Sequence, residues 1–141
     1  MKIENRLYPD QLSLWGGKLK KDETWMSRLS DFLPKLNELI QEAVKDEDRM
    51  EYGDDLARFD AHLANFTYLV RKERDLALAK GYQMYPKGEY NSDAQVALAR
   101  QYASEEVRLR ELLADLGRAL HQRMSINTTA ITVYREGIKH G

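Results

Sequence analysis

The sequence predicts an all-α protein built on a long antiparallel helical hairpin with short flanking helices. Apolar residues recur at spacings of three and four along most of the 141 residues, which is the period of helices that bury one face. Only three prolines and eight glycines interrupt this pattern. We therefore expect a single all-helical domain over residues 1–141, divided into segments 1–21, 22–53, 54–124 and 125–141.

Segments 1–21 and 22–53 lead into the hairpin. Between Asp10 and Leu14 we expect a short element that ends at Gly16-Gly17 and packs onto the body through Leu12, Leu14 and Trp15. A first helix is expected from Asp22 or Glu23 to about Asp46, with these residues on one face: Trp25, Leu29, Phe32 or Leu33, Leu36, Leu39 or Ile40, and Val44. Pro34 either kinks this helix or lies in the first turn of a new helix capped by Ser30 or Asp31.

Segment 54–124 carries the hairpin. After a break at Gly53, we expect Asp54 or Asp55 to cap a second helix that ends at Gly81 and buries Leu56, Phe59, Leu63, Phe66, Leu69 with Val70, and Leu76 with Ala77. Pro86 and Gly88 favour a reversing loop up to Asn91. A third helix, capped by Ser92 or Asp93, is expected to return along the second and to bury Leu98, Tyr102, Leu109, Leu112, Leu116, and Ala119 or Leu120.

The C-terminal segment becomes rich in β-branched residues between Met124 and Val133. This composition predicts a helix break, followed by a short final helix whose inward face carries Ile126, Ala130, Val133 or Tyr134, and Ile138. The extra apolar residues Leu113, Leu120 and Met124 widen the buried face of the third helix. We expect a homo-oligomer to cover this face, although the first helix of the same chain is an equal alternative.

Composition excludes several classes of protein. Without cysteine there is no disulfide framework, thiolate metal site or cysteine nucleophile. Neither a signal peptide nor an apolar run of membrane-spanning length is visible, so we expect a soluble cytoplasmic protein without a membrane role. The 22 Lys and Arg residues against 23 Asp and Glu give a net charge of -1, so any binding of nucleic acid must depend on local clusters of cations.

The sequence contains no pattern typical of catalysis. None of His62, His121 and His140 has a nucleophile or a carboxylate at a recognisable spacing. Adjacent acids such as Asp54-Asp55 are explained by helix capping, and no calcium loop, di-iron pattern or P-loop occurs. We therefore expect no enzyme, no catalytic residue, no metal site and no cofactor. A metal-dependent nucleotide hydrolase using scattered acids is a weaker alternative.

The strongest candidate site lies between residues 71 and 90, where cations and aromatic residues are mixed. Cations can follow phosphates while aromatic faces accept unstacked bases, as in proteins that hold a single nucleic-acid strand. The alternative is a solvated charged helix with intrahelical pairs such as Arg71 to Asp75, and Arg100 and Arg108 could extend the basic surface. The predicted nucleic-acid-binding residues are Arg71, Lys72, Arg74, Lys80, Tyr82, Tyr85 and Lys87.

Three consecutive segments of the chain resemble phage recombination-mediator proteins of the UvsY type. These are RKERDLALAKGYQMYPKG, NSDAQVALARQYASEEVRLRELLADLGRALHQRMS and INTTAITVYREGIKHG. The resemblance lies in an alanine-rich basic helix, a following loop with tyrosines and glycine, a long returning helix, a break at Arg123, Met124 and Ser125, and a final short helix with Tyr134 and Arg135.

This resemblance implies a non-enzymatic accessory factor of phage recombination or replication, acting in the cytoplasm of the infected bacterium. Such a factor binds single-stranded DNA as a ring-like oligomer and helps a RecA-like recombinase to displace the single-strand-binding protein. The family places DNA contacts near the end of the alanine-rich helix, where this chain has Lys80. Leu78 stands where a second cation is expected, with Lys72 and Arg74 earlier in the helix.

A competing hypothesis is a phage-encoded protein-binding factor, such as an inhibitor or adaptor of a host protein, without DNA binding. Between Asp46 and Asp55 the sequence contains six acids against Arg49 alone. This acidic turn, or an apolar face of the hairpin, could contact a protein partner. Charge reversal at Lys72 and Lys80 separates the two hypotheses, because it should abolish strand binding and leave partner binding nearly intact.

Overall fold

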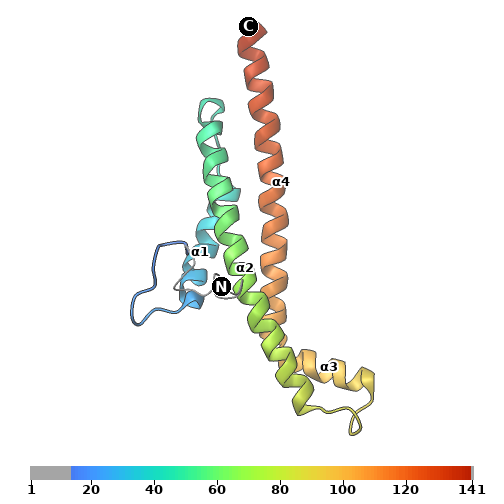
Figure 1. Ribbon diagram of the computed structural model, residues 1–141. Coiled ribbons are helices and arrows are strands. Elements are labelled where there is room, and N and C mark those ends of the chain that lie inside the picture. Colours follow the sequence, from blue (N-terminus) through green and yellow to red (C-terminus); the bar gives the residue numbers. More distant parts are fainter. Residues whose placement is uncertain (1–13, 141) are drawn as a thin grey trace, which may run out of the picture. The chain divides into compact units, whose positions relative to one another are not determined.

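The computed structural model describes residues 14–140, and within them the structure is helical and contains no strand (Figure 1). The elements are α1 (Trp25–Ile40), the 3₁₀ helix η2 (Asp46–Asp48), α2 (Arg49–Met84), α3 (Ser92–Tyr102) and α4 (Ser104–His140). This confirms the predicted all-α class. Along residues 14–140, none of the helices combines the length and the apolar character that crossing a membrane requires.

The chain divides into two compact units. The first unit consists of residues up to 65 together with residues from 116 onward, and the second unit consists of residues 66–115. Both long helices, α2 and α4, contribute to both units. The buried apolar side chains of the first unit are Leu14, Leu29, Phe32, Leu36, Tyr52, Leu56, Leu63 and Leu120, and those of the second are Phe66, Leu69, Val70, Ala99, Ala103 and Leu113.

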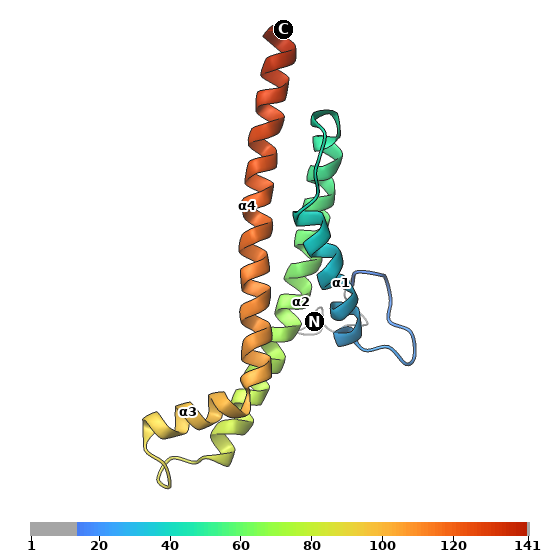
Figure 2. The ribbon, with the colours of Figure 1, turned by 180° about the vertical axis from the view of Figure 1, so that it is seen from behind.

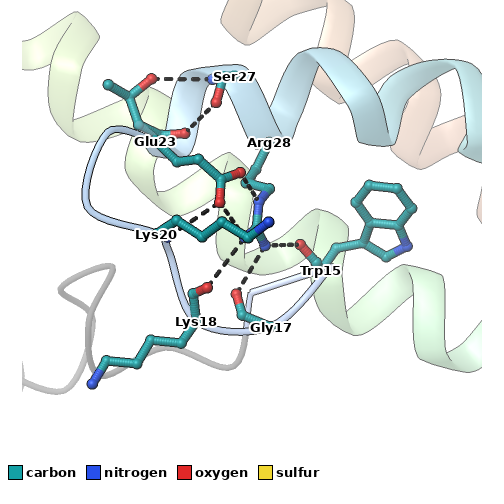
Figure 3. A network of polar contacts seen from close by, with 8 residues as sticks. Trp15, Gly17, Lys18, Lys20, Glu23, Ser27 and Arg28 are labelled. Atoms are coloured by element: carbon teal, nitrogen blue, oxygen red, sulfur yellow. Dashed lines mark hydrogen bonds and ion pairs between the residues drawn. The ribbon is translucent and has the colours of Figure 1, made fainter.

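Arg28 holds the loop that precedes α1 (Figure 3). Its buried guanidinium group donates hydrogen bonds to the carbonyl oxygens of Trp15 (3.1 Å), Gly17 (2.9 Å) and Lys18 (3.1 Å). Leu14 is buried beneath this loop, and the ring of Trp15 meets Phe32 edge-on at 5.7 Å, which confirms that both side chains pack inward. Residues 10–13, and with them Leu12 and the start of the expected short element, lie outside the described part of the chain.

Helix α1 is a single helix that passes through Pro34. It begins later than predicted because the side chain of Thr24 accepts a hydrogen bond from the backbone of Ser27 and so caps the helix. A new helix starting near Pro34 is therefore wrong, as is an end near Asp46, since α1 stops at Ile40. The buried residues Leu29, Phe32 and Leu36 lie on the predicted face.

Helix α2 begins before Gly53 and continues beyond Gly81, so both predicted ends are wrong. The short helix η2 leads directly into α2, and both glycines lie where a neighbouring helix comes close. A Cβ added at Gly53 would lie 3.1 Å from the Nδ2 atom of Asn127. The predicted stripe is confirmed for its buried members Leu56, Leu63, Phe66, Leu69 and Val70, but Leu76 is exposed.

In the first unit, α2 and α4 run antiparallel, as the hairpin prediction requires. Asp60, Tyr52 and Arg49 of α2 contact His121, Arg123 and Asn127 of α4, in that order. The residue numbers of the contacting partners thus decrease along α2 as they increase along α4. Both views show the two helices side by side (Figures 1 and 2). Arg123 also donates to the carbonyl oxygen of Glu42 (2.7 Å), which ties the loop after α1 to this pair.

Helix α4 continues without a break through the β-branched segment, contrary to the prediction. The hydroxyl groups of Thr128, Thr129 and Thr132 each donate to the carbonyl oxygen four residues earlier, at 3.0 to 3.2 Å. These side chains are thereby accommodated inside a helix. The predicted inward face is also wrong, because Ile126, Val133 and Ile138 are exposed and Asn127 is buried instead.

In the second unit, the predicted third helix is divided at Ala103 into α3 and α4. The side chain of Asn91, one residue before the expected caps, accepts a bond from the backbone of Ala94 (2.8 Å) and begins α3. A Cβ added at Gly81 would lie 2.8 Å from the Cα atom of Ala99, so α2 and α3 touch through their backbones.

The division between α3 and α4 changes which residues of the returning chain are buried. Leu112 and Tyr102, both predicted to face inward, are exposed, whereas Leu120 is buried as predicted, and so is Leu113, which was expected to widen the buried face. The prediction assumed one uninterrupted helical period from Ser92 onward. Because a new helix starts at Ser104, the period starts again there and a different set of residues faces inward.

Candidate nucleic-acid interface

All seven predicted binding residues lie in the second unit, but the fold places them on different surfaces. Arg71 and Lys80 are nine residues apart in α2, which corresponds to two and a half turns, so they lie on opposite sides of this helix. Tyr85 and Lys87 follow the end of α2, in the loop before α3. The predicted basic end is therefore a broad region around α2 and not a narrow stripe, and its role in binding stays a prediction.

Arg71 and Arg74 form one part of the candidate site, and α4 adds Arg110 to them. The position of Arg110 follows from the register of the helices. Glu106 lines the same hollow as Glu73 of α2. Arg110 lies one turn further along α4, and because the helices run antiparallel it lies about one turn earlier along α2, at the level of Arg71.

The environment of Arg110 is unusual for a cation. Its Nε atom is shielded from solvent and has no hydrogen-bond acceptor within the described part of the chain. Burial lowers the pKa of Arg110, and the charges of Arg71 and Arg74 lower this pKa further. A guanidinium group nevertheless keeps its proton in proteins. The arrangement therefore holds three positive charges together and partly removes one of them from water.

One carboxylate offsets part of this charge. Arg74 donates to Asp75 from Nη2 (3.0 Å) and from Nε (3.3 Å). Asp75 thus pairs with Arg74, and not with Arg71 as the solvated-helix alternative supposed. Because the carboxylate of Asp75 is 60% exposed, this pair contributes little to stability and can exchange with solvent or a ligand.

Lys80 belongs to a different surface. It lines a hollow of about 370 Å³ together with Glu73, Leu76, Ala77, Tyr102 and Glu106. Two carboxylates share this hollow with a single ammonium group, so Lys80 does not add to a purely positive surface. A phosphate that approaches Lys80 also meets Glu73 and Glu106.

The two predicted stacking tyrosines differ in their accessibility. Tyr82, near the end of α2, is 39% exposed. Tyr85 is half-buried, and its ring meets Tyr90 at 5.5 Å and 83°, an edge-on contact within the loop. Lys87 is exposed in the same loop. Tyr82 therefore presents an accessible ring to a base, whereas Tyr85 contributes to the packing of the loop.

Arg110 was not among the cations that the sequence suggested across the hairpin, which were Arg100 and Arg108. A simple hairpin register does not find it, because a loop centred near Tyr85 to Lys87 pairs residue 110 with about residue 62, and the separate helix α3 shifts this register. Sequence reasoning also missed the contact between Asp60 and the Nε2 atom of His121 (2.8 Å). This histidine side chain is 66% exposed.

Other groups of polar side chains lie in the first unit. A hollow after α1 is lined by Glu42, Ala43, Val44, Lys45, Asp48, Glu51, Tyr52 and Asp55. Four of these residues are acidic and one is basic, so the surface is negative. Among residues 14–140, no three histidine or acidic side chains form a group that could hold a metal ion.

No protein-family model, curated protein or solved structure matches this chain.

Proposed function

We propose that this protein is a non-enzymatic phage accessory factor of recombination or replication that binds single-stranded DNA and loads a RecA-like recombinase. The observation that carries the DNA-binding part is the gathering of Arg71, Arg74 and Arg110 within the same unit as an exposed tyrosine, Tyr82. Cations that follow phosphates and a ring that accepts a base are the two components of strand binding.

In this proposal the arginines contact the phosphates and fix the path of the strand. Such contacts carry no sequence information, so binding is tolerant of sequence. Tyr82 stacks on an unpaired base, which favours a single strand over a duplex. Lys72, Lys80 and Lys87 add positive charge around the unit, while Tyr85 keeps the loop in shape through Tyr90.

Recombinase loading and displacement of a single-strand-binding protein rest on the resemblance to mediators of the UvsY type. The same resemblance suggests a homo-oligomer in the cytoplasm of a phage-infected bacterium. Exposed apolar residues on the last turns of α4 support self-association, because Val133 and Ile138 are 65% and 64% exposed.

Fluorescence anisotropy of a labelled single-stranded oligonucleotide tests the proposal, with a duplex of equal length as the comparison. We expect binding at low salt that prefers the single strand and weakens at physiological salt, because phosphate contacts release counterions. The double variant Arg71→Glu with Arg74→Glu should lose about tenfold or more in affinity. Lys35→Glu, an exposed position of α1, is the matched control. Absence of binding at low salt would overturn the proposal.

A second candidate function, a protein-binding inhibitor or adaptor, is favoured by the negative hollow after α1. Asp48, Glu51 and Asp55 line this hollow, and the neighbouring Met50 is 55% exposed. Such a surface suits a partner with basic and apolar residues. Lysine substitutions at Asp48 and Glu51 should then abolish partner capture in a pull-down, while the Arg71 and Arg74 variants should capture the partner as the natural protein does.

A further inference from the structure

We propose that Arg71, Arg74 and Arg110 form a seat for one phosphate group, anchored by Arg110. The assignment of a single-stranded DNA as the source of this phosphate rests on the proposed function. The seat itself rests on the placement of the three side chains. Arg71 and Arg74 lie one turn apart on α2, and Arg110 of α4 is near enough for the charges of both to act on it.

The register of the second unit supports this placement. Glu106 shares a hollow with Glu73 and Ala77, so it marks the level at which α4 meets this part of α2. One turn further along α4, Arg110 reaches the level of Arg71. Arg110 is half-buried, and its Nε atom is shielded from solvent. The Nε side of the guanidinium group is thus shielded between the two helices, while the residue as a whole stays partly accessible.

The electrostatics of this seam favour an anion. The charges that act on Arg110 are those of Arg71 and Arg74, both of the same sign as its own. A cation that is partly buried beside two others loses hydration without gaining a carboxylate partner. The carboxylate of Asp75 is engaged with Arg74. A bound anion would relieve the repulsion among all three cations at once.

The chemistry of the three groups selects phosphate among anions. A guanidinium group presents a planar fork of donors that matches two oxygens of a phosphate, and three forks can engage several oxygens of one group. Because Arg71 is exposed and Arg74 and Arg110 are partly accessible, the phosphate can belong to a nucleic-acid strand or be free inorganic phosphate. Both sources share the same chemistry, and the experiment separates them.

The test is thermal unfolding in inorganic phosphate at a fixed ionic strength, with chloride as the comparison. The natural protein should be stabilised by phosphate, because a ligand that binds the folded state raises the melting temperature. Arg110→Met keeps an apolar stem in the seam and removes the charge, so the apparent affinity for phosphate should fall about tenfold or more. Arg110→Lys should restore it only in part, since an ammonium group lacks the fork.

Two controls keep the test decisive. Arg108→Met removes an exposed arginine from the same helix and should leave phosphate binding unchanged. In chloride alone, Arg110→Met should melt at the same temperature as the natural protein or higher, because it relieves repulsion, so loss of phosphate binding cannot be ascribed to misfolding.

The strand and phosphate experiments fail in different ways. Phosphate binding that depends on Arg110, without any strand binding, would support the seat and overturn the proposed function. Strand binding that is equal in Arg110→Met and in the natural protein, with no stabilisation by phosphate, would overturn the seat and leave the proposed function standing. Competition between phosphate and the strand, lost in Arg110→Met, supports both.

Discussion

Arg28 is the residue on which the loop before α1 depends. Four backbone or side-chain groups converge on its guanidinium group, including the carboxylate of Glu23 at 2.7 Å. Gly16 and Gly17 adopt φ values of +87° and +84°, which let the chain turn tightly around this group. The loop therefore has a specific polar anchor in addition to the burial of Leu14.

Acid should loosen this loop. The hydrogen bond from Arg28, and then that from the backbone of Lys20, lower the pKa of Glu23 from 4.5 to about 2. Because the pKa is lower in the folded state, the carboxylate contributes its full stabilisation above about pH 4.5 and loses it as the pH falls towards 2. Tryptophan fluorescence should follow this change, since Trp15 is held in the loop.

The variant Glu23→Gln provides the comparison. Its tryptophan fluorescence at neutral pH should already be that of the loosened loop. This fluorescence should then show no transition between about pH 4.5 and 2. Glu38→Gln, at an exposed position of α1, is the control and should behave as the natural protein does. If Glu23→Gln and the natural protein give the same pH profile, the anchor has been misassigned.

Two helical glycines should respond to alanine in opposite directions. At Gly81 an added Cβ meets the backbone of Ala99 at 2.8 Å, so Gly81→Ala should destabilise the protein by about 1–3 kcal/mol. At Gly117 the nearest atom is the Cδ2 of Leu63 at 3.8 Å, an ordinary contact. Gly117→Ala should therefore stabilise by about 0.5–1 kcal/mol through helix propensity. Urea unfolding measures both, and equal signs would contradict the described contacts.

At the scale of elements, one buried amide holds the continuous helix α4 against the start of α2. Asn127 donates to the carbonyl oxygen of Arg49 (3.0 Å) and accepts from the guanidinium group of Arg49 (3.4 Å). Its burial at 2% exposure, amid exposed apolar neighbours, is the reverse of an ordinary amphipathic pattern. The polar contact therefore sets which face of this part of α4 turns towards α2.

Substituting this amide tests its role. Asn127→Leu should destabilise the protein by about 1–3 kcal/mol, because it removes both hydrogen bonds to the partly buried Arg49 and leaves its side chain with Asp46 alone. Thr128→Ala changes the adjacent, exposed residue, whose hydroxyl bonds within α4, and should lie within about 0.5 kcal/mol of the natural protein. Denaturant unfolding gives both values. A neutral Asn127→Leu would mean that apolar packing alone aligns the two helices.

At the scale of the whole molecule, the exposed apolar residues near the C-terminus predict self-association. Ile126, Ala130 and Val133 lie at spacings of four and three, which is the seam of a coiled coil. A second copy would cover this seam. Light scattering after size-exclusion chromatography should therefore show a species larger than the 16.4 kDa chain.

Charge on the seam should reverse this association. Ile126→Lys with Val133→Lys should shift the protein to the mass of one chain, because a buried ammonium group is costly at an apolar interface. Thr132→Lys, an exposed neighbour outside the seam, should leave the mass unchanged. A natural protein that already has the mass of one chain at high concentration would remove this prediction.

Much of the fold could be read from local patterns. The buried faces of α1 and of the first half of α2 repeat at helical spacing, so Leu29, Leu36, Leu56 and Phe66 were placed inward correctly. The turn after α2 was marked by Pro86 and Gly88. The predicted helix ends at Gly53 and Gly81 were wrong. At both positions glycine lets a neighbouring helix come close, and it does not end α2.

The sequence by itself determined that this protein is helical and where the chain reverses, because both depend on residues a few positions apart. Only the tertiary structure decided that α3 and α4 separate at Ala103, that α4 continues through its threonines, and that Arg110 meets Arg71 and Arg74. These features depend on contacts between residues far apart in the chain, whose free energies exceed the small differences in local propensity that sequence patterns record.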